Sequence, residues 1–210
     1  MNLKKLKQAE SLFFIRYPGG FLNPELQIIG KKHRMPHMTG LAQESFGKSR
    51  FRQQEAVADA MVKMVSRSSL VSLFEKPRFR DLMKTPAIDK AMLVGGLKDF
   101  LHGDQQRGLE YMTESLVRAG LAKWSLVSLI PNYYRPNDEV FVKPTTAKGV
   151  IEFFDLKGLH YAPRPSWDFY RDFRDQVLDM KSHVDPSLAI SNAAFLGFLV
   201  VGFRGAVVRA

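Results

Sequence analysis

Cysteine is absent from this chain of 210 residues. Its absence excludes disulfide bonds, thiolate zinc sites and cysteine nucleophiles together, and it fits the cytoplasmic location that we predict. Internal repeats and low-complexity segments are also missing. The most apolar stretch, "AAFLGFLVVGF" from Ala193, ends at Arg204 after 11 residues, whereas a membrane-spanning helix needs about 20. We therefore predict a buried final helix or strand here, with membrane association as the minor alternative, and no transmembrane segment.

The sequence motifs of several enzyme classes are missing as well. The glycines of "YPGGF" and "VGGLKD" lack the spacing of phosphate-binding or dinucleotide-binding loops, and no Gly-x-Ser-x-Gly motif is present. His33 and His37 are four residues apart, but Pro36 between them disfavours the regular helix that would place both on one face. We predict no metal site and no cofactor.

One acidic pattern does have the spacing of a helical stripe. Such a row of carboxylates could bind divalent cations. Arginines are interleaved with it, however, and negative charge in the first turn of a helix is favoured by the helix dipole. We interpret the stripe as a solvated helix face; its members are Asp168, Asp172, Asp175 and Asp179, with Arg171 and Arg174 between them.

Positive charge is plentiful and unevenly distributed. The net charge is +10, and residues 1–90 contain 17 Lys and Arg against 8 Asp and Glu. Residues 91–210 contain 14 against 13, so they are nearly neutral. Such asymmetry is typical of a protein that presents one face to a polyanion, such as nucleic acid or an acidic partner.

The basic residues of the first part occur in short clusters. "KSRFR" and "KPRFR" share an Arg-Phe-Arg form, which could offer guanidinium groups to phosphates and a ring to stack on bases. Alternatively, Phe51 and Phe79 anchor the core while the arginines point outward. The candidate polyanion-binding residues are Lys31, Lys32, Arg34, Arg50, Arg52, Arg78 and Arg80.

The apolar periodicity predicts a mainly α fold with a small β element, formed as a single compact domain over residues 1–210. The clearest amphipathic helix follows Ser166, with Phe169, Phe173 and Val177 at spacings of four. A helix capped by Thr85 and stopped by Gly103 is expected to pair with one over residues 104–120. Extended segments at 139–143 and 159–163 flank a short helix and could pair in a small sheet.

The stretch "FVKPTTAKGV" lies where the first extended segment gives way to a helix. Pro144 favours the first turn, and Thr145 can be its N-cap. Free amides flanked by lysines would make an anion site, although capping alone also explains the threonines. "RPSWDFY" is a second helix start of this kind. Together they give a possible anion or ligand pocket of Lys143, Thr145, Thr146, Lys148, Arg164, Trp167 and Tyr170.

The order of five segments resembles that of a family of uncharacterised bacterial proteins. "YPGGFLNPE", "SLFEKPRFRDLMK", "GLKDFLHG", "VFVKPTTAKGV" and "RPSWDFYRDF" are similar to its Pro-Gly-Gly-Phe, Phe-Glu-Lys with Arg-Asp, Phe-Leu-His-Gly, Phe-(Leu/Val)-Lys-Pro and Arg-Pro-(Ser/Asn)-Trp-x-x-Tyr motifs. The resemblance covers residues 13–182 and implies a bacterial, cytoplasmic protein of a single unit. The family has no established activity, so it assigns no catalytic residue. The apolar ending from Ala193 departs from the family's polar-aromatic one.

Three functions remain open at this point. The first is a basic protein that contacts nucleic acid or another polyanion through its N-terminal part. The second is an enzyme or ligand-binding protein that uses a pocket between the two helix starts at 143–148 and 164–170. The third is a protein-interaction module, or a self-associating chain, that docks through the apolar segment 193–208.

Overall fold

The computed structural model describes the backbone of residues 1–207 and the side chains of residues 1–203. Over this range the chain is helical, and no strand is present. The α-helices are α1 (Leu3–Arg16), α2 (Pro24–His33), α3 (Met35–Ser45), α4 (Gln54–Arg67), α5 (Glu75–Leu82), α6 (Lys90–His102), α7 (Gln105–Val117), α8 (Trp124–Val127), α9 (Leu129–Tyr134), α10 (Pro144–Phe153), α11 (Trp167–Ser182) and α12 (Asn192–Val207). Short 3-10 helices are η1 (Gly20–Leu22), η2 (Lys48–Arg52) and η3 (Pro186–Leu188).

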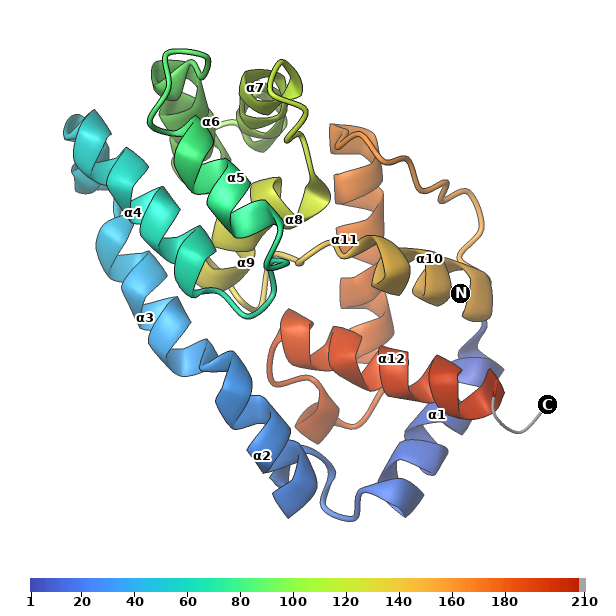
Figure 1. Ribbon diagram of the computed structural model, residues 1–210. Helices are drawn as coiled ribbons and strands as arrows, with labels where there is room; N and C mark the ends of the chain where they lie inside the picture. Colours follow the sequence, from blue (N-terminus) through green and yellow to red (C-terminus); the bar gives the residue numbers. More distant parts are fainter. Residues whose placement is uncertain (208–210) are drawn as a thin grey trace.

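The helices form two groups around a shared centre (Figure 1). Helices α2 to α5 lie on one side, with the α6–α7 hairpin at their end, and α1, α10 and α12 lie on the other. The short helices α8 and α9 are buried between them, where Trp124, Leu129 and Tyr133 are at most 1% exposed. One hydrophobic cluster runs through both groups, which confirms the predicted mainly α, single-domain fold.

The α6–α7 hairpin is predicted correctly, and glycine lets its helices approach closely. A Cβ atom added to Gly96 would lie 2.8 Å from the backbone nitrogen of Met112. One added to Gly108 would overlap the backbone of Phe100. Any side chain at these two positions would force the helices apart, because the obstructing atoms are backbone rather than mobile side chain.

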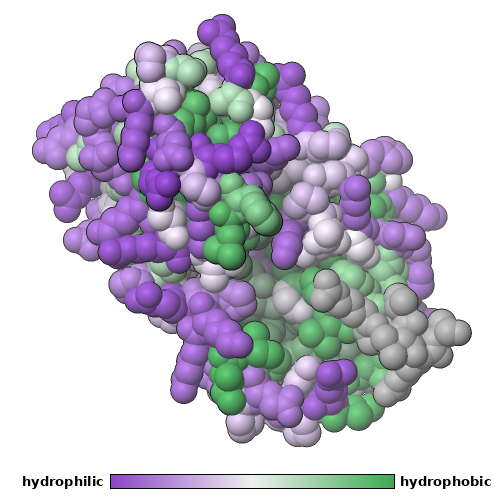
Figure 2. Space-filling model, viewed as in Figure 1, coloured by the Kyte–Doolittle hydropathy of each residue, from purple (hydrophilic) through white to green (hydrophobic). Residues whose placement is uncertain are grey.

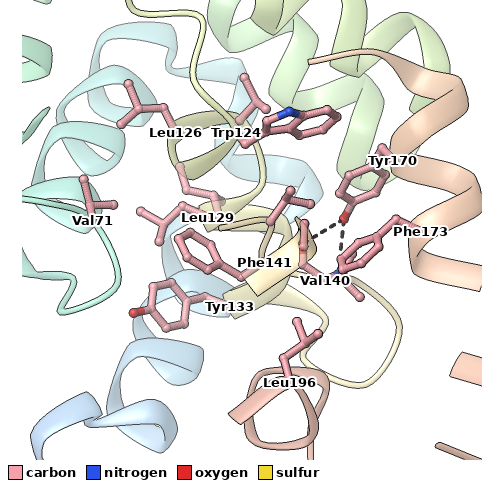
Figure 3. Packing of buried hydrophobic residues seen from close by; sticks show 14 of the residues in the cluster. Val71, Trp124, Leu126, Leu129, Tyr133, Val140, Phe141, Tyr170, Phe173 and Leu196 are labelled. Atoms are coloured by element: carbon pink, nitrogen blue, oxygen red, sulfur yellow. Dashed lines mark hydrogen bonds between the residues drawn. The ribbon is translucent and has the colours of Figure 1, made fainter. Parts of the chain in front are cut away.

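The predicted β element is wrong. Residues 139–143 do run without helix, but they pass through the core alone and pair with no strand in the described part of the chain. Side chains satisfy their backbone instead: the Val140 N–H donates to the Tyr170 hydroxyl at 3.3 Å, and the Val142 N–H donates to Ser128 Oγ at 3.0 Å. Figure 3 shows Tyr170 reaching the Val140 backbone. Buried backbone groups need partners, and here side chains replace a sheet.

The segment at 159–163 likewise forms no strand. It leads towards α11 along the surface, and its Ala162 carbonyl accepts a hydrogen bond of 2.8 Å from Trp124 Nε1. That bond lets the indole of Trp124 lie fully inside the core, because its one polar group is satisfied at the edge.

Two predicted N-caps also differ from the structure. The helix expected from Thr85 and Pro86 begins later, with Asp89 as its N-cap accepting from the Met92 N–H at 2.9 Å. Helix α10 begins at Pro144, so Lys143 and not Thr145 is its N-cap. Proline favours the first helical position because it lacks an N–H that would otherwise be unpaired.

The apolar C-terminal segment forms a buried helix, as one of the predicted alternatives had it. In α12, Phe195, Phe198 and Leu199 are fully buried, and the helix packs against α1 and α10. The apolar side chains of residues 195–199 therefore stabilise this chain's own core; Val208 lies outside the described residues. None of the described helices combines the length and the apolar character needed to cross a membrane.

Candidate polyanion-binding surface

The seven candidate residues all lie on the surface of the group formed by α2 to α5. Their elements border the same helix: η2 and α5 pack against α4, and His33 at the end of α2 lies 2.9 Å from Ser69, just past the end of α4. We call this set the basic surface. It comprises Lys31, Lys32, Arg34, Arg50, Arg52, Arg78 and Arg80, and every one of these side chains is exposed.

The rings between the arginines face inward. Phe79 is 2% exposed and belongs to the core. Phe51 is partly buried and packs edge-on against the ring of His102, with centroids 5.6 Å apart. A helix or 3-10 turn that buries the central Phe directs its two neighbours outward. The structure thus favours the anchoring interpretation over stacking on bases.

Few charges on this surface are neutralised internally. Of the seven residues, Arg80 alone has an ion pair among the described side chains, 3.1 Å from its neighbour Asp81. An exposed pair of this kind contributes little to stability. Figure 2 shows hydrophilic side chains over α3, α4 and α5 on the face presented there.

The acidic stripe on α11 is not a free row of carboxylates. Arg171 pairs with Asp168 at 3.3 Å and with Asp172 at 2.8 Å, and Arg174 contacts Asp175 at 3.5 Å. The Arg171–Asp168 pair has the three-residue spacing of helix-face ion pairs, and the other two pairs join neighbouring residues.

The residues of the alternative pocket border different hollows. The first, which we call the Lys143 hollow, has a volume of about 340 Å³. Lys123 and Lys143 lie on its wall together with Tyr161 and the start of α10, where no side chain caps the helix. Glu75 lies there too and accepts from Ser125 Oγ at 2.9 Å. Its carboxylate opposes the binding of an anion.

The exposed Thr145 and half-buried Thr146 follow Lys143 in the first turn of α10. Lys148 lies one turn on and places its ammonium group 5.1 Å from the centre of the Tyr161 ring, a cation–π contact. Lys143 therefore lines the hollow, whereas Lys148 does not line it and contacts the Tyr161 ring instead.

The second hollow, of about 450 Å³, contains Arg164 and Trp167. Arg164 forms an ion pair with Glu114 at 3.3 Å. The guanidinium group over the Trp167 ring is that of Arg174, 5.6 Å from its centre, and not that of the nearer residue in the sequence, Arg164. Segment 161–165 separates this hollow from the Lys143 hollow.

Tyr170 lines neither hollow; it is completely buried in a polar cluster that sequence reasoning missed. At the centre is Glu139, 2% exposed. Its carboxylate accepts from Gln105 at 2.7 Å and from Tyr170 at 3.0 Å. Arg135 and Arg174 pair with it at 3.0 and 3.3 Å. We call these five residues the buried carboxylate cluster.

The cluster joins four parts of the fold and changes the proton affinity of its tyrosine. Burial, together with the charge of Glu139, raises the pKa of Tyr170 well above its usual value. Asn192 at the start of α12 also donates to the Glu139 carbonyl at 3.0 Å. The cluster therefore ties α7, α11 and α12 to the extended segment, which indicates a role in stability.

A scan against protein-family models, a search of curated proteins and a search of solved structures each found no match for this chain. The resemblance to a bacterial family therefore stays a prediction, and function has to be argued from the geometry alone.

Proposed function

We propose that the protein binds a polyanion through the basic surface, with nucleic acid as the ligand to test first. The observation that carries the proposal is the set of exposed arginines on η2 and α5 that lack internal partners. Arg50, Arg52 and Arg78 have no ion pair among the described residues. Guanidinium groups of this kind form strong, bidentate hydrogen bonds with phosphates.

The ligand-pocket alternative has weaker support. The Lys143 hollow contains two lysines and an uncapped helix start, but Glu75 lies on the same wall. A bound anion would have to approach that carboxylate. Arg50 also shares a hollow with a carboxylate, that of Glu44, but Arg52 and Arg78 line no described hollow with one, and none of the three arginines forms an ion pair in the described structure.

The test is a salt series. Binding of fluorescent single-stranded RNA and duplex DNA would be measured by anisotropy from low to moderate ionic strength. We expect the logarithm of the association constant to fall linearly with the logarithm of salt, by about 0.9 per phosphate contact on a duplex. The double variant Arg50→Gln, Arg52→Gln should bind less tightly and reduce that slope by about two contacts.

A matched control exists in the other half of the chain. Lys98 and Arg118 are exposed and lack ion pairs among the described residues, so Lys98→Gln with Arg118→Gln removes the same charge elsewhere. If both double variants lose affinity equally, only the net charge matters and the proposed surface is wrong. Binding that ignores salt, or no binding to either nucleic acid, would refute the proposal itself.

A further inference from the structure

The loop between α4 and α5 presents two large apolar side chains to solvent. Leu73 is 80% exposed and Phe74 is 83% exposed, and they are neighbours in sequence. We call this pair the apolar tip. Figure 2 shows an apolar patch near the centre of the face presented, over this loop. Scattered single apolar residues on a surface are ordinary, whereas an adjacent exposed pair is a candidate contact site.

Several basic residues lie near the apolar tip, either in the sequence or through contacts of the same loop. Along the chain, Arg67 precedes it and Lys76 and Arg78 follow it. Ser72, the residue before the tip, borders the Lys143 hollow, which places Lys123 and Lys143 beside it. His33 contacts Ser69 in the same loop, which brings its neighbours Lys31, Lys32 and Arg34 towards it.

The acidic residue nearest the tip is already engaged. Glu75 accepts from the Ser72 hydroxyl at 3.0 Å and from the Ser125 hydroxyl at 2.9 Å. These bonds fold the carboxylate back against the loop. The carboxylate keeps its negative charge beside the tip, but the neighbouring lysines and arginines outnumber it.

Helix α2 adds apolar surface next to the same cationic cluster. It has no fully buried residue, and Ile28 and Ile29 are 61% and 48% exposed. Lys31 and Lys32 follow in its last turn. A surface helix with exposed branched aliphatic side chains beside lysines has the composition of an element that lies in a membrane interface.

We infer that the polyanion met by this face is an anionic lipid bilayer, with Leu73 and Phe74 inserted among the lipids and the surrounding lysines and arginines on the headgroups. The inference rests on the polyanion binding proposed above and names its partner. Leu73 favours lipid over nucleic acid as the partner. An aliphatic side chain is stabilised by transfer from water into hydrocarbon, but it offers no ring to stack on a base. Each basic residue near an anionic leaflet adds electrostatic attraction.

Vesicle co-sedimentation tests this inference. Full-length protein would be mixed with vesicles of phosphatidylcholine alone, and with vesicles of equal parts phosphatidylcholine and phosphatidylserine. We expect binding to the second only, weakened by added salt. The double variant Leu73→Ser, Phe74→Ser should bind at least roughly tenfold more weakly, since both side chains lose their apolar insertion.

The control is Ile15→Ser on α1. Ile15 is 74% exposed and outside this surface, so its removal should leave vesicle binding unchanged. Because all three side chains are exposed, we expect every variant to keep the wild-type denaturation midpoint. A second variant, Lys123→Gln with Lys143→Gln, should weaken binding to anionic vesicles and reduce its salt dependence.

The outcomes separate this inference from the proposed function. Nucleic-acid binding without vesicle binding would overturn the lipid inference and leave polyanion binding standing. Equal binding to both vesicle types would overturn it too, because charge would then play no part. If the Leu73→Ser, Phe74→Ser variant lost RNA affinity as strongly as vesicle affinity, the tip would be a nucleic-acid contact and the inference would be wrong. Failure to bind any polyanion would refute both proposals.

Discussion

Residues 24–84 and residues 91–203 contain six arginines each, and the two regions use them differently. In the second region five of the six form ion pairs: Arg107, Arg135, Arg164, Arg171 and Arg174. In the first region Arg80 alone does so among the described residues. One region pairs its guanidinium groups with carboxylates, within a helix or between parts of the fold, whereas the other leaves most of them to solvent. Because the unpaired arginines contribute nothing to the fold, a partner can bind them without disturbing the fold.

The largest effect should come from removing the acid at the centre of the paired region. Glu139→Ala leaves Arg135 and Arg174 partly buried without their shared carboxylate, and breaking a buried pair from one side costs about 3–5 kcal/mol. We expect a loss near the lower end, because Arg135 keeps 32% of its side chain exposed. Urea denaturation measures it. Glu44→Ala, on the exposed surface of α3, should change stability by less than about 0.5 kcal/mol; equal losses would abolish the contrast between the regions.

A second test concerns the contact of α6 with α7. Gly108→Ala places a methyl group against the backbone of Phe100 and Gly96, and such overpacking costs about 1–3 kcal/mol. Gly95→Ala in the same hairpin meets nothing within 4 Å and should be neutral or stabilising by up to about 1 kcal/mol. Thermal unfolding of both variants compares them directly. A tolerated alanine at 108 would show that the hairpin is looser than described.

The raised pKa of Tyr170 predicts a loss of stability in alkali. In the unfolded chain this tyrosine releases its proton near pH 10, whereas the folded protein retains it to higher pH. The stability that the raised pKa of Tyr170 contributes is thus fully present below about pH 10. It is lost as the pH rises from there through the pKa of the folded state. Tyr170→Phe should lower stability at neutral pH by about 1–3 kcal/mol, because the Val140 N–H loses its acceptor.

Denaturation midpoints of both proteins between pH 8 and 11, chosen around the unfolded tyrosine pKa of about 10, would reveal this difference. The variant should lose less stability across that range than the wild type. If the denaturation midpoints of the two proteins fell equally with pH, Tyr170 would not govern the loss of stability in alkali. Burial also raises the pKa of Tyr133, an effect that its hydrogen bond with Ser68 partly offsets. Both the wild type and the variant should therefore keep some loss of stability with rising pH.

The smallest effect is expected on the basic surface. Arg50→Gln and Arg52→Gln should each alter the free energy of unfolding by less than about 0.5 kcal/mol. Arg174→Gln, which removes a bond to Glu139, should cost about 1.5–3 kcal/mol. The pairing of charges thus predicts which arginines matter for folding. A destabilisation by Arg50→Gln as large as that of Arg174→Gln would break the comparison.

Local sequence patterns predicted the helices well. The amphipathic spacing after Ser166 gave α11, and Gly103 ends α6 as expected. The burial of Phe79 between two exposed arginines follows from the same periodicity. These features depend on residues a few positions apart, whose interactions the sequence displays directly.

Apart from the two N-caps at Thr85 and Thr145, the errors involve partners that are distant in sequence. Residues 139–143 have the composition of a strand, and nothing near them shows that Ser128, Tyr170 and Asn192 would satisfy their backbone. Glu139 escaped notice for the same reason, since its partners lie as far away as residue 174. The apolar tip was missed because a Leu-Phe pair beside a helix start is normally core, and only solvent exposure distinguishes it.

The extended segment has a consequence for how this chain folds. A strand in a hairpin can form early with its neighbour, but the amides of Val140 and Val142 gain partners only when α11 and α8 are already in place. Closing such long loops is slow. We expect the Val140 amide to become protected late in refolding, and to exchange with solvent deuterium only through openings that detach α11. The extended segment at 139–143 would then be among the last parts of the molecule to reach its native structure.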